Sequence, residues 1–376
     1  MSNKTLRISV GIIAMIGISW IAFLSNTNTT AYITKDFKVD LLELDSTYCS
    51  NLLIGVQVEV DPFDYQSTEA LFQKLHDHLN PYKEKILSSN NRVIVFPEHI
   101  GTWLVATDEY PSIYHSGSIT KAMLRMILSH PIKYLQTRLK GTEAPNATQA
   151  GIFLFNAEKM ATAYQTVFSR LAKEYKATVI AGSIVLPDPV AESGQIKFTG
   201  KKLYNTSFVF LPDGSLSTAV TKKVFPVDFE QTFCAAGNVE DMTTVPMATG
   251  NIATLICADS WYPEIYEKIR AQSASIIVVP SYSVGERIMA SPWQGYNGFA
   301  PPSGIELSDV MQISEEAAWD KYALSGRILE SEIGLNVFLR GQLWDMESDG
   351  RSKMVVNGQD HKTNTNGAVI LMVCLP

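Results

Sequence analysis

Residues 254–266, with the sequence TLICADSWYPEIY, contain the pattern that decides the fold. The apolar run 252–256 predicts a buried strand, and a polar turn follows it. Pro263 stands where a new helix takes its first residue, a position at which proline is favoured. Cys257 is therefore predicted to lie at a strand-to-helix turn.

A thiol at such a turn stands clear of the sheet and faces the free N–H groups of a helix start. Those groups lower the pKa of a thiol, and nucleophilic cysteines are often built in this way. A lone cysteine at the end of a strand is more often a small core residue, however. The stretch alone therefore favours a structural role for Cys257, and the rest of the chain has to decide.

The composition excludes several classes of protein. The 376 residues are 46% hydrophobic and 18% charged, which suffices for one large domain or two modest ones. The net charge of −7 argues against a nucleic-acid partner. Cys49, Cys234, Cys257 and Cys374 form no CxxC pair, and the six histidines lack ligand spacing, so we expect neither a metal nor an organic cofactor. The sequence leaves open whether Cys49 pairs with Cys374.

The amino-terminal segment differs from the rest of the chain. Lys4 and Arg7 precede seventeen uncharged residues, 8–24. This pattern over residues 1–29 predicts a retained membrane anchor, because the run is long for a cleaved signal peptide and no clear cleavage site follows. A cleaved signal peptide, which would give a secreted protein, and a buried helix are the alternatives. The basic flank keeps the amino end in the cytosol, so the body is expected in the periplasm or an equivalent extracytoplasmic space.

The body of the chain mixes helices and strands throughout. We predict a tether over residues 30–50 and one domain over 51–376, since no boundary is visible within the latter. The first elements read as strand, helix and strand, the start of a layered α/β sheet. The predicted strands are 51–58, 92–98, 177–183, 204–211, 252–256, 275–281, 335–340, 352–356 and 367–373, and the predicted helices are 67–79, 119–128, one beginning at Asn156, and 315–333.

Three reactive side chains follow predicted strands: Glu98, Lys223 and Cys257. Each has an ordinary explanation as a turn, surface or core residue. Open α/β sheets bind ligands beyond the carboxyl ends of their strands, so groups at these positions tend to line a ligand site. Sequence spacing alone does not show that the three meet.

These residues lie in motifs that resemble a known family. Residues 96–98 (FPE), 221–223 (TKK) with Glu230, and 256–260 (ICADS) resemble the nitrilase superfamily of carbon–nitrogen hydrolases, which uses a Glu-Lys-Cys triad. The resemblance covers residues 51–373. It implies a four-layer αββα sandwich and a homodimer or higher homo-oligomer.

The resemblance also implies a role for each residue. Cys257 is the nucleophile, Glu98 is the general acid and base, and Lys223 stabilises the oxyanion together with a backbone N–H near Ala258. Glu230 positions the substrate or Lys223.

Other positions remain alternatives or expectations. Lys222 is the alternative to Lys223, which is preferred because residues 224–228 fall in the family's register after it. Trp261, Tyr282 and Trp293 are expected to bind the substrate.

The sequence departs from the family at three points. The segment between Glu98 and Lys223 is longer than is usual for small members of the family, and the additional length falls in residues 103–146. For these residues, packing in the core or in a dimer is favoured over a lid on the substrate. Ala258 stands where nitrilases carry Trp, which favours amides over nitriles. The chain has one predicted membrane span, whereas the lipoprotein N-acyltransferases of the superfamily have several. That branch is therefore not expected.

The sequence therefore predicts an amidase that cleaves a small amide at a non-peptide C–N bond. An acyltransferase with the same triad and a catalytically inactive binding or scaffold protein are the alternatives.

Overall fold

The computed structural model describes residues 38–44, 49–247, 249–364 and 367–376. The strands are β1 (Val39–Leu44), β2 (Asn51–Gln57), β3 (Glu59–Val60), β4 (Asn91–Val95), β5 (Thr178–Ile180), β6 (Ile184–Glu192), β7 (Gln195–Phe210), β8 (Leu216–Lys222), β9 (Thr244–Met247), β10 (Gly250–Thr254), β11 (Ala274–Ser281), β12 (Ile333–Phe338), β13 (Arg340–Leu343), β14 (Met346–Ser348), β15 (Lys353–Val356), β16 (Gln359–Lys362) and β17 (Ala368–Cys374). The α-helices are α2 (Thr68–Leu79), α3 (Lys83–Ser88), α4 (Pro111–Tyr114), α5 (Ile119–Ser129), α6 (Pro131–Leu139), α7 (Ala147–Tyr175), α8 (Asp228–Gln231), α9 (Pro263–Arg270), α10 (Glu315–Tyr322) and α11 (Leu324–Arg327).

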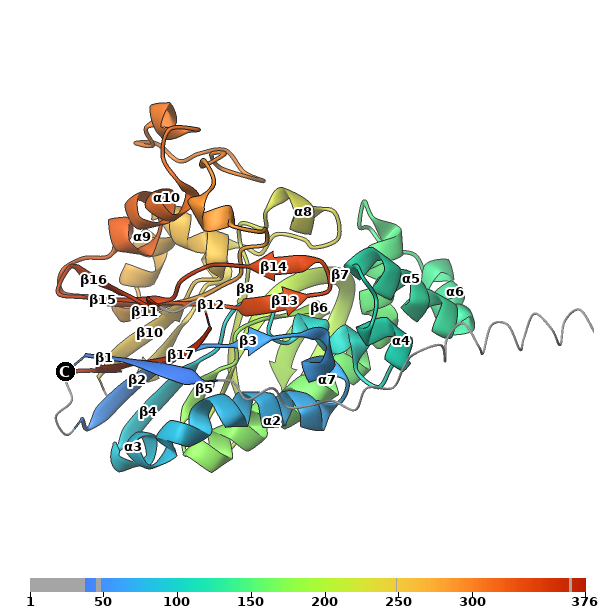
Figure 1. Ribbon diagram of the computed structural model, residues 1–376, viewed down its shortest axis with the longest axis horizontal. Helices are drawn as coiled ribbons and strands as arrows, with labels where there is room; N and C mark the ends of the chain where they lie inside the picture. Colours follow the sequence, from blue (N-terminus) through green and yellow to red (C-terminus); the bar gives the residue numbers. More distant parts are fainter. Residues whose placement is uncertain (1–37, 45–48, 248, 365–366) are drawn as a thin grey trace, which may run out of the picture.

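Two large sheets form the centre of the molecule. The first sheet has the order β1-β17-β2-β4-β5-β7-β6, with β8 paired to β7, and the second has the order β16-β15-β12-β11-β10-β9. Figure 1 shows the strands between α2, α3 and α7 on one side and α9 and α10 on the other. The predicted αββα arrangement is therefore present.

The alternation of side chains along β2 explains the layers. Leu52, Ile54 and Val56 belong to the core between the first sheet and its helices, whereas Leu53 belongs to the core between the two sheets. Both faces of the strand are thus buried, which is why its sequence reads as an unbroken apolar run. Gly55 lets the sheets approach, since a Cβ there would lie 2.9 Å from Leu335 Cδ1.

Two predicted helices have different bounds. α7 begins at Ala147, where the Asn146 side chain accepts a hydrogen bond from the Gln149 amide, and not at Asn156. Asn156 lies buried within α7, and its Nδ2 donates to the Ile152 carbonyl. Asparagine usually caps helices, but here its side chain bonds the backbone of the preceding turn of the helix. The predicted helix 315–333 is two short helices, α10 and α11, because the backbone leaves the helical conformation at Ala323.

The predicted tether is wrong over its second part. Residues 39–44 form β1, which pairs in parallel with β17 and extends the first sheet. Leu42 and Leu44 pack against the core between the sheets, which accounts for their apolar character. A disulfide joins Cys49 to Cys374 at the end of β17, a pairing that the sequence alone left open. The folded domain begins before residue 51.

The predicted membrane span lies outside the described residues and stays a prediction. Within the four described ranges, no helix is long and apolar enough to cross a bilayer.

Residues 103–146 form a helical extension of the sandwich. Its first part is core: Trp103 and Leu104 are buried, and the Trp344 indole N–H donates to the Ile113 carbonyl. Helices α5 and α6 follow and contact α7. The expected packing role is therefore present for the inner side of this segment.

The disulfide closes a loop of most of the chain, so it is predicted to stabilise the fold chiefly by restricting the unfolded state. Cys49→Ser/Cys374→Ser is expected to lower the free energy of unfolding by about 2–4 kcal/mol in urea denaturation. Dithiothreitol should destabilise the parent protein to the same degree and leave the double variant unchanged. Equal stability of the parent with and without reductant would contradict this expectation.

Candidate active site

Three strand ends from two sheets bring the predicted triad together. Glu98 follows β4 and Lys223 follows β8, both in the first sheet, whereas Cys257 follows β10 in the second. All three side chains are buried. The site therefore lies where the carboxyl ends of strands from both sheets meet.

A sharp turn after β4 fixes Glu98. His99 has a φ of 59°, and its amide donates to Ser183 Oγ at 2.8 Å. Gly101 and Gly182 leave room for the turn, because a Cβ would lie 2.4 Å from Tyr164 Cδ2 at the former and 2.0 Å from the Pro97 carbonyl oxygen at the latter.

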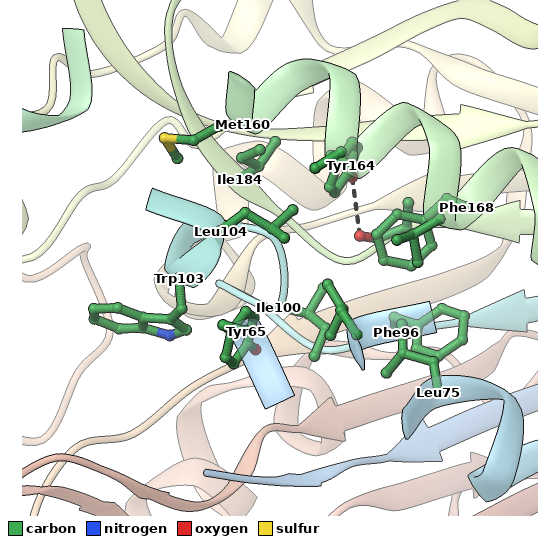
Figure 2. Packing of buried hydrophobic residues seen from close by; sticks show 14 of the residues in the cluster. Tyr65, Leu75, Phe96, Ile100, Trp103, Leu104, Met160, Tyr164, Phe168 and Ile184 are labelled. Atoms are coloured by element: carbon green, nitrogen blue, oxygen red, sulfur yellow. Dashed lines mark hydrogen bonds between the residues drawn. The ribbon is translucent and has the colours of Figure 1, made fainter. Parts of the chain in front are cut away.

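Buried side chains anchor this turn to the core. Figure 2 shows residues that follow Glu98 packed among side chains from several elements: Ile100, Trp103 and Leu104, with Tyr65, Met160, Tyr164 and Ile184. The backbone of Glu98 therefore cannot shift without repacking this cluster.

Lys223 lies between two carboxylates. Its Nζ is 2.8 Å from Glu98 Oε1 and 2.5 Å from Glu230 Oε2. Burial on its own lowers the pKa of Lys223, but the Glu230 and Glu98 carboxylates outweigh it and raise that pKa well above its ordinary value. Lys222 pairs instead with Asp188 at 2.6 Å. The alternative assignment of Lys222 to the site is thus not supported by its position.

Glu230, on α8, holds Lys223 from the other side. Its Oε2 also accepts a hydrogen bond from the Val227 amide, and His99 Nε2 lies 3.3 Å from its Oε1. Burial alone would raise the pKa of Glu230, but the charge of Lys223 and the contact with His99 hold it well below the ordinary value. Glu230 is therefore an anion that positions Lys223.

Asn205 on β7 is a site residue that the sequence did not single out. Its Nδ2 donates to Glu98 Oε1 at 2.9 Å and to Glu230 Oε1 at 2.8 Å, and its backbone carbonyl accepts from the Lys223 backbone amide. One lysine cannot satisfy four carboxylate oxygens, and this amide supplies donors to two of them. The position lies in the Tyr-Asn-Thr stretch 204–206, which was the available signal.

Cys257 begins a short 3-10 helix, η5 (Cys257–Trp261), with a φ of 52°. This left-handed conformation costs a non-glycine residue energy and often marks a functional position. Its Sγ lies 3.8 Å from the Tyr282 carbonyl oxygen. Burial, and then the charge of Glu98, raise the pKa of the Cys257 thiol well above its ordinary value. Burial and Glu98 therefore oppose the lowering of this pKa that the helix start led us to expect.

Asp259 locks the turn that carries Cys257. One of its oxygens accepts from the Val224 and Phe225 amides at 3.0 and 2.8 Å, and the other accepts from the Ile256 amide. Burial raises the pKa of Asp259 to about 7, against the effect of these donors. The residue ties the Cys257 turn to the segment that follows Lys223, a role that the motif alone did not reveal.

The backbone of Tyr282 contacts both Glu98 and Cys257. Its amide donates to Glu98 Oε2 at 3.0 Å, while its carbonyl faces Cys257 Sγ, and its ring lies 6.0 Å from that of His99. The structure thus brings Tyr282 to the site, and its contact with substrate stays a prediction.

The two tryptophans have a different environment. Trp261 and Trp293 stack on each other and join Trp319, Tyr322 and Tyr296 in the core beyond the second sheet. Trp293 is only 1% exposed. Their packing accounts for both residues, and their contact with substrate stays a prediction.

Ala258 offers a backbone donor next to the thiol. It stands in the first turn of η5, where amide N–H groups have no partner within the helix. This is the donor that the sequence assigned to an oxyanion.

Glu98, His99 and Glu230 also have a geometry that suits a metal ion, with ligand atoms within 4.8 Å of one another. Lys223 Nζ bonds both carboxylates, so an ammonium already stands where a cation would be attracted. The donor set is therefore better explained as an ion-paired cluster.

The arrangement combines a buried thiol, a buried carboxylate, an ammonium held by two carboxylates and the first-turn amide N–H of Ala258. Such a set can deliver a nucleophile, move its proton and stabilise negative charge on a carbonyl oxygen.

Comparisons with known proteins agree with this chemistry. Residues 56–298 match the family model described as carbon–nitrogen hydrolase. The chain is 31% identical over 133 residues to the 2-oxoglutaramate amidase of Paenarthrobacter nicotinovorans, which is 34% of this chain and 42% of the relative. It is 28% identical over 137 residues to a deaminated glutathione amidase of Synechocystis sp., which is 34% of this chain and 47% of that relative. The matched segments thus span less than half the length of these curated relatives.

Solved structures match over more of the chain. A mutant of the Nesterenkonia AN1 amidase from the nitrilase superfamily aligns with a TM-score of 0.53 at 13% identity, over 87% of this chain and 92% of that one. A double mutant of the same amidase in complex with acrylamide aligns with a TM-score of 0.52 at 12% identity, over 89% and 93%. These likenesses support the fold. The chain belongs to the carbon–nitrogen hydrolase family.

Proposed function

We propose that this protein is an amidase that hydrolyses a non-peptide C–N bond through a thioester on Cys257. The observation that carries the proposal is the meeting of a thiol, a carboxylate and an ammonium from three separated segments in one buried cluster. The relatives that match part of the chain are named as amidases, which supports the same reaction class.

The first step forms the thioester. Because the pKa of the thiol is raised, Glu98 takes the proton as Cys257 Sγ attacks the amide carbon. The negative charge that develops on the carbonyl oxygen is stabilised by the Lys223 ammonium and by the Ala258 N–H. Glu98 then returns the proton to the departing ammonia or amine, and the C–N bond breaks.

The second step releases the acid. Water attacks the thioester carbon while Glu98 takes one of its protons, and the C–S bond breaks with the proton returned to sulfur. Glu230 and Asn205 keep Lys223 and Glu98 in place during both steps. Their hydrogen bonds leave little freedom for either group to rotate.

The substrate class rests on two observations. The relatives are named for 2-oxoglutaramate and deaminated glutathione, both of which are amides. In addition, Ala258 stands where nitrilases carry Trp, which favours amides over nitriles. Both compounds therefore belong in the first panel of substrates. Acyl transfer differs only in the second step, where an amine replaces water.

We infer that the domain works outside the cytoplasm. The disulfide between Cys49 and Cys374 supports this location, because disulfides persist in oxidising compartments. Its support is independent of the apolar run at residues 8–24, from which the location was first predicted.

Ammonia release from the amide panel tests the reaction. Cys257→Ala is expected to reduce turnover by a factor on the order of 10⁴ or more, because it removes the sulfur on which the proposed thioester forms. Cys234→Ala, which removes the other buried free thiol, is the matched control and should retain turnover. Undiminished activity in Cys257→Ala would disprove the assignment. Ammonia without the free acid would indicate acyl transfer.

Alkylation by iodoacetamide tests the base. Cys257 should react faster than Cys234, because Glu98 can accept its proton, and the difference should be lost in Glu98→Gln. The rate at Cys257 should also still rise with pH above about 8.5, the ordinary thiol pKa, since its own pKa is raised. Mass spectrometry of the two cysteine peptides measures both rates. A rate at Cys257 that is the same in Glu98→Gln would contradict the proposed base.

Asn205→Leu tests whether the Asn205 side chain holds the Glu98 and Glu230 carboxylates in place. Loss of a donor to charged groups is expected to lower kcat about 10- to 100-fold with a smaller change in KM. Asn156→Leu removes a buried asparagine of α7 that makes no contact with the triad and serves as the control. Equal loss of kcat in both variants would indicate a general effect on folding.

A further inference from the structure

Helices α5 and α6 carry an exposed apolar face. They extend from one end of the sandwich (Figure 1). Tyr134 and Arg138 turn toward α7, where they would lie 3.0 and 3.2 Å from a Cβ at Gly151. Four large aliphatic residues of the two helices are largely exposed: Leu124 (53%), Ile132 (72%), Leu135 (59%) and Leu139 (79%). We call these four residues the outer face.

The outer face follows helical periodicity. Ile132, Leu135 and Leu139 are spaced three and four residues apart, so they form one stripe along α6. A stripe of this kind normally packs into a core, and its exposure marks an interaction site.

Only basic charges surround this face in the sequence. Residues 110–142 contain five Lys and Arg residues and no Asp or Glu, in a chain with a net charge of −7. Lys121, Lys133, Arg138 and Lys140 are exposed, and within the described part of the chain none of them has an ion-pair partner. Glu143, just beyond, pairs with Lys202.

We propose that the outer face docks on an anionic lipid surface. A helix with an aliphatic stripe bordered by Lys and Arg lies in the interface of a bilayer, with the stripe among the acyl chains and the cations among acidic headgroups. Lys133 and Lys140 border the stripe of α6 on one side and Arg138 on the other, as this geometry requires.

A second copy of the chain fits this face less well. A two-fold contact would bring two identical sets of cations together, at a distance where they repel. The four exposed side chains also offer only a few hundred Å², below the roughly 800 Å² per partner of a stable dimer.

The proposal goes beyond the proposed reaction and does not depend on it. An anchor at residues 8–24, as predicted from the sequence, would hold the domain at a bilayer and raise the effective concentration of lipid at this face. The docked helices would then fix the orientation of the domain relative to the bilayer.

Radical footprinting of the full chain tests the proposal. The protein is reconstituted into vesicles of phosphatidylcholine alone or of phosphatidylcholine with phosphatidylglycerol, and side-chain oxidation is read by mass spectrometry. Ile132, Leu135 and Leu139 should lose most of their reactivity only in the anionic vesicles. Leu307 and Met311, which are exposed elsewhere, should react equally in both and are the internal controls.

Charge reversal supplies the matched variants. Lys133→Glu/Lys140→Glu should lower the population of the docked state by roughly 10-fold or more and restore oxidation, whereas Arg287→Glu/Arg351→Glu, also exposed, should not. Equal oxidation of the outer face in both vesicle types would overturn the proposal. Protection in both types and in detergent that increases with protein concentration would overturn it in favour of a second copy.

Discussion

One buried ammonium holds the site together. Lys223 bonds Glu98 and Glu230, which come from distant segments, and all three side chains are almost fully removed from water. Two carboxylates that bond the same ammonium lie so close together that they would repel each other strongly without it. Burial of the three charges costs desolvation energy, and only full pairing offsets it. The Asn205 amide and the Tyr282 N–H supply that pairing for Glu98, and the Val227 N–H supplies it for Glu230.

The packing of the two sheets brings this cluster close to the Cys257 thiol. Glu98 and Lys223 belong to the first sheet and Cys257 to the second, so their separation depends on how closely the sheets pack. Gly55, facing Leu335, permits that approach in the core between the sheets. Asp259 then joins the Cys257 turn to the backbone just after Lys223, which fixes the position of the Cys257 turn relative to Lys223.

The sequence was sufficient for the parts that local pattern controls. The strand-to-helix turn at Cys257, the proline start of α9 and the acid after β4 all follow from periodicity and residue type. The resemblance to the carbon–nitrogen hydrolases is confirmed by the family match. It could be recognised because the short motifs keep their order along the chain.

The remaining features depend on contacts that spacing does not encode. Asn205 is one of many asparagines until its two carboxylate partners are known, and Asp259 becomes informative only beside Val224 and Phe225. The raised pKa of Cys257 follows from burial and from Glu98, neither of which is visible in a helix start. The sequence does not reveal β1 as a strand, because its partner, β17, is more than 300 residues away.

Trapping the acyl-enzyme tests the central claim most directly. The protein is mixed with an amide that it cleaves, quenched with acid within the first turnover, digested and analysed by mass spectrometry. The account predicts that the peptide with Cys257 gains the mass of the acyl group less one hydrogen, and that hydroxylamine removes this increment as it does other thioesters. Continuous release of product with Cys257 unmodified at every quench time, and with the adduct on another residue or on none, would contradict it.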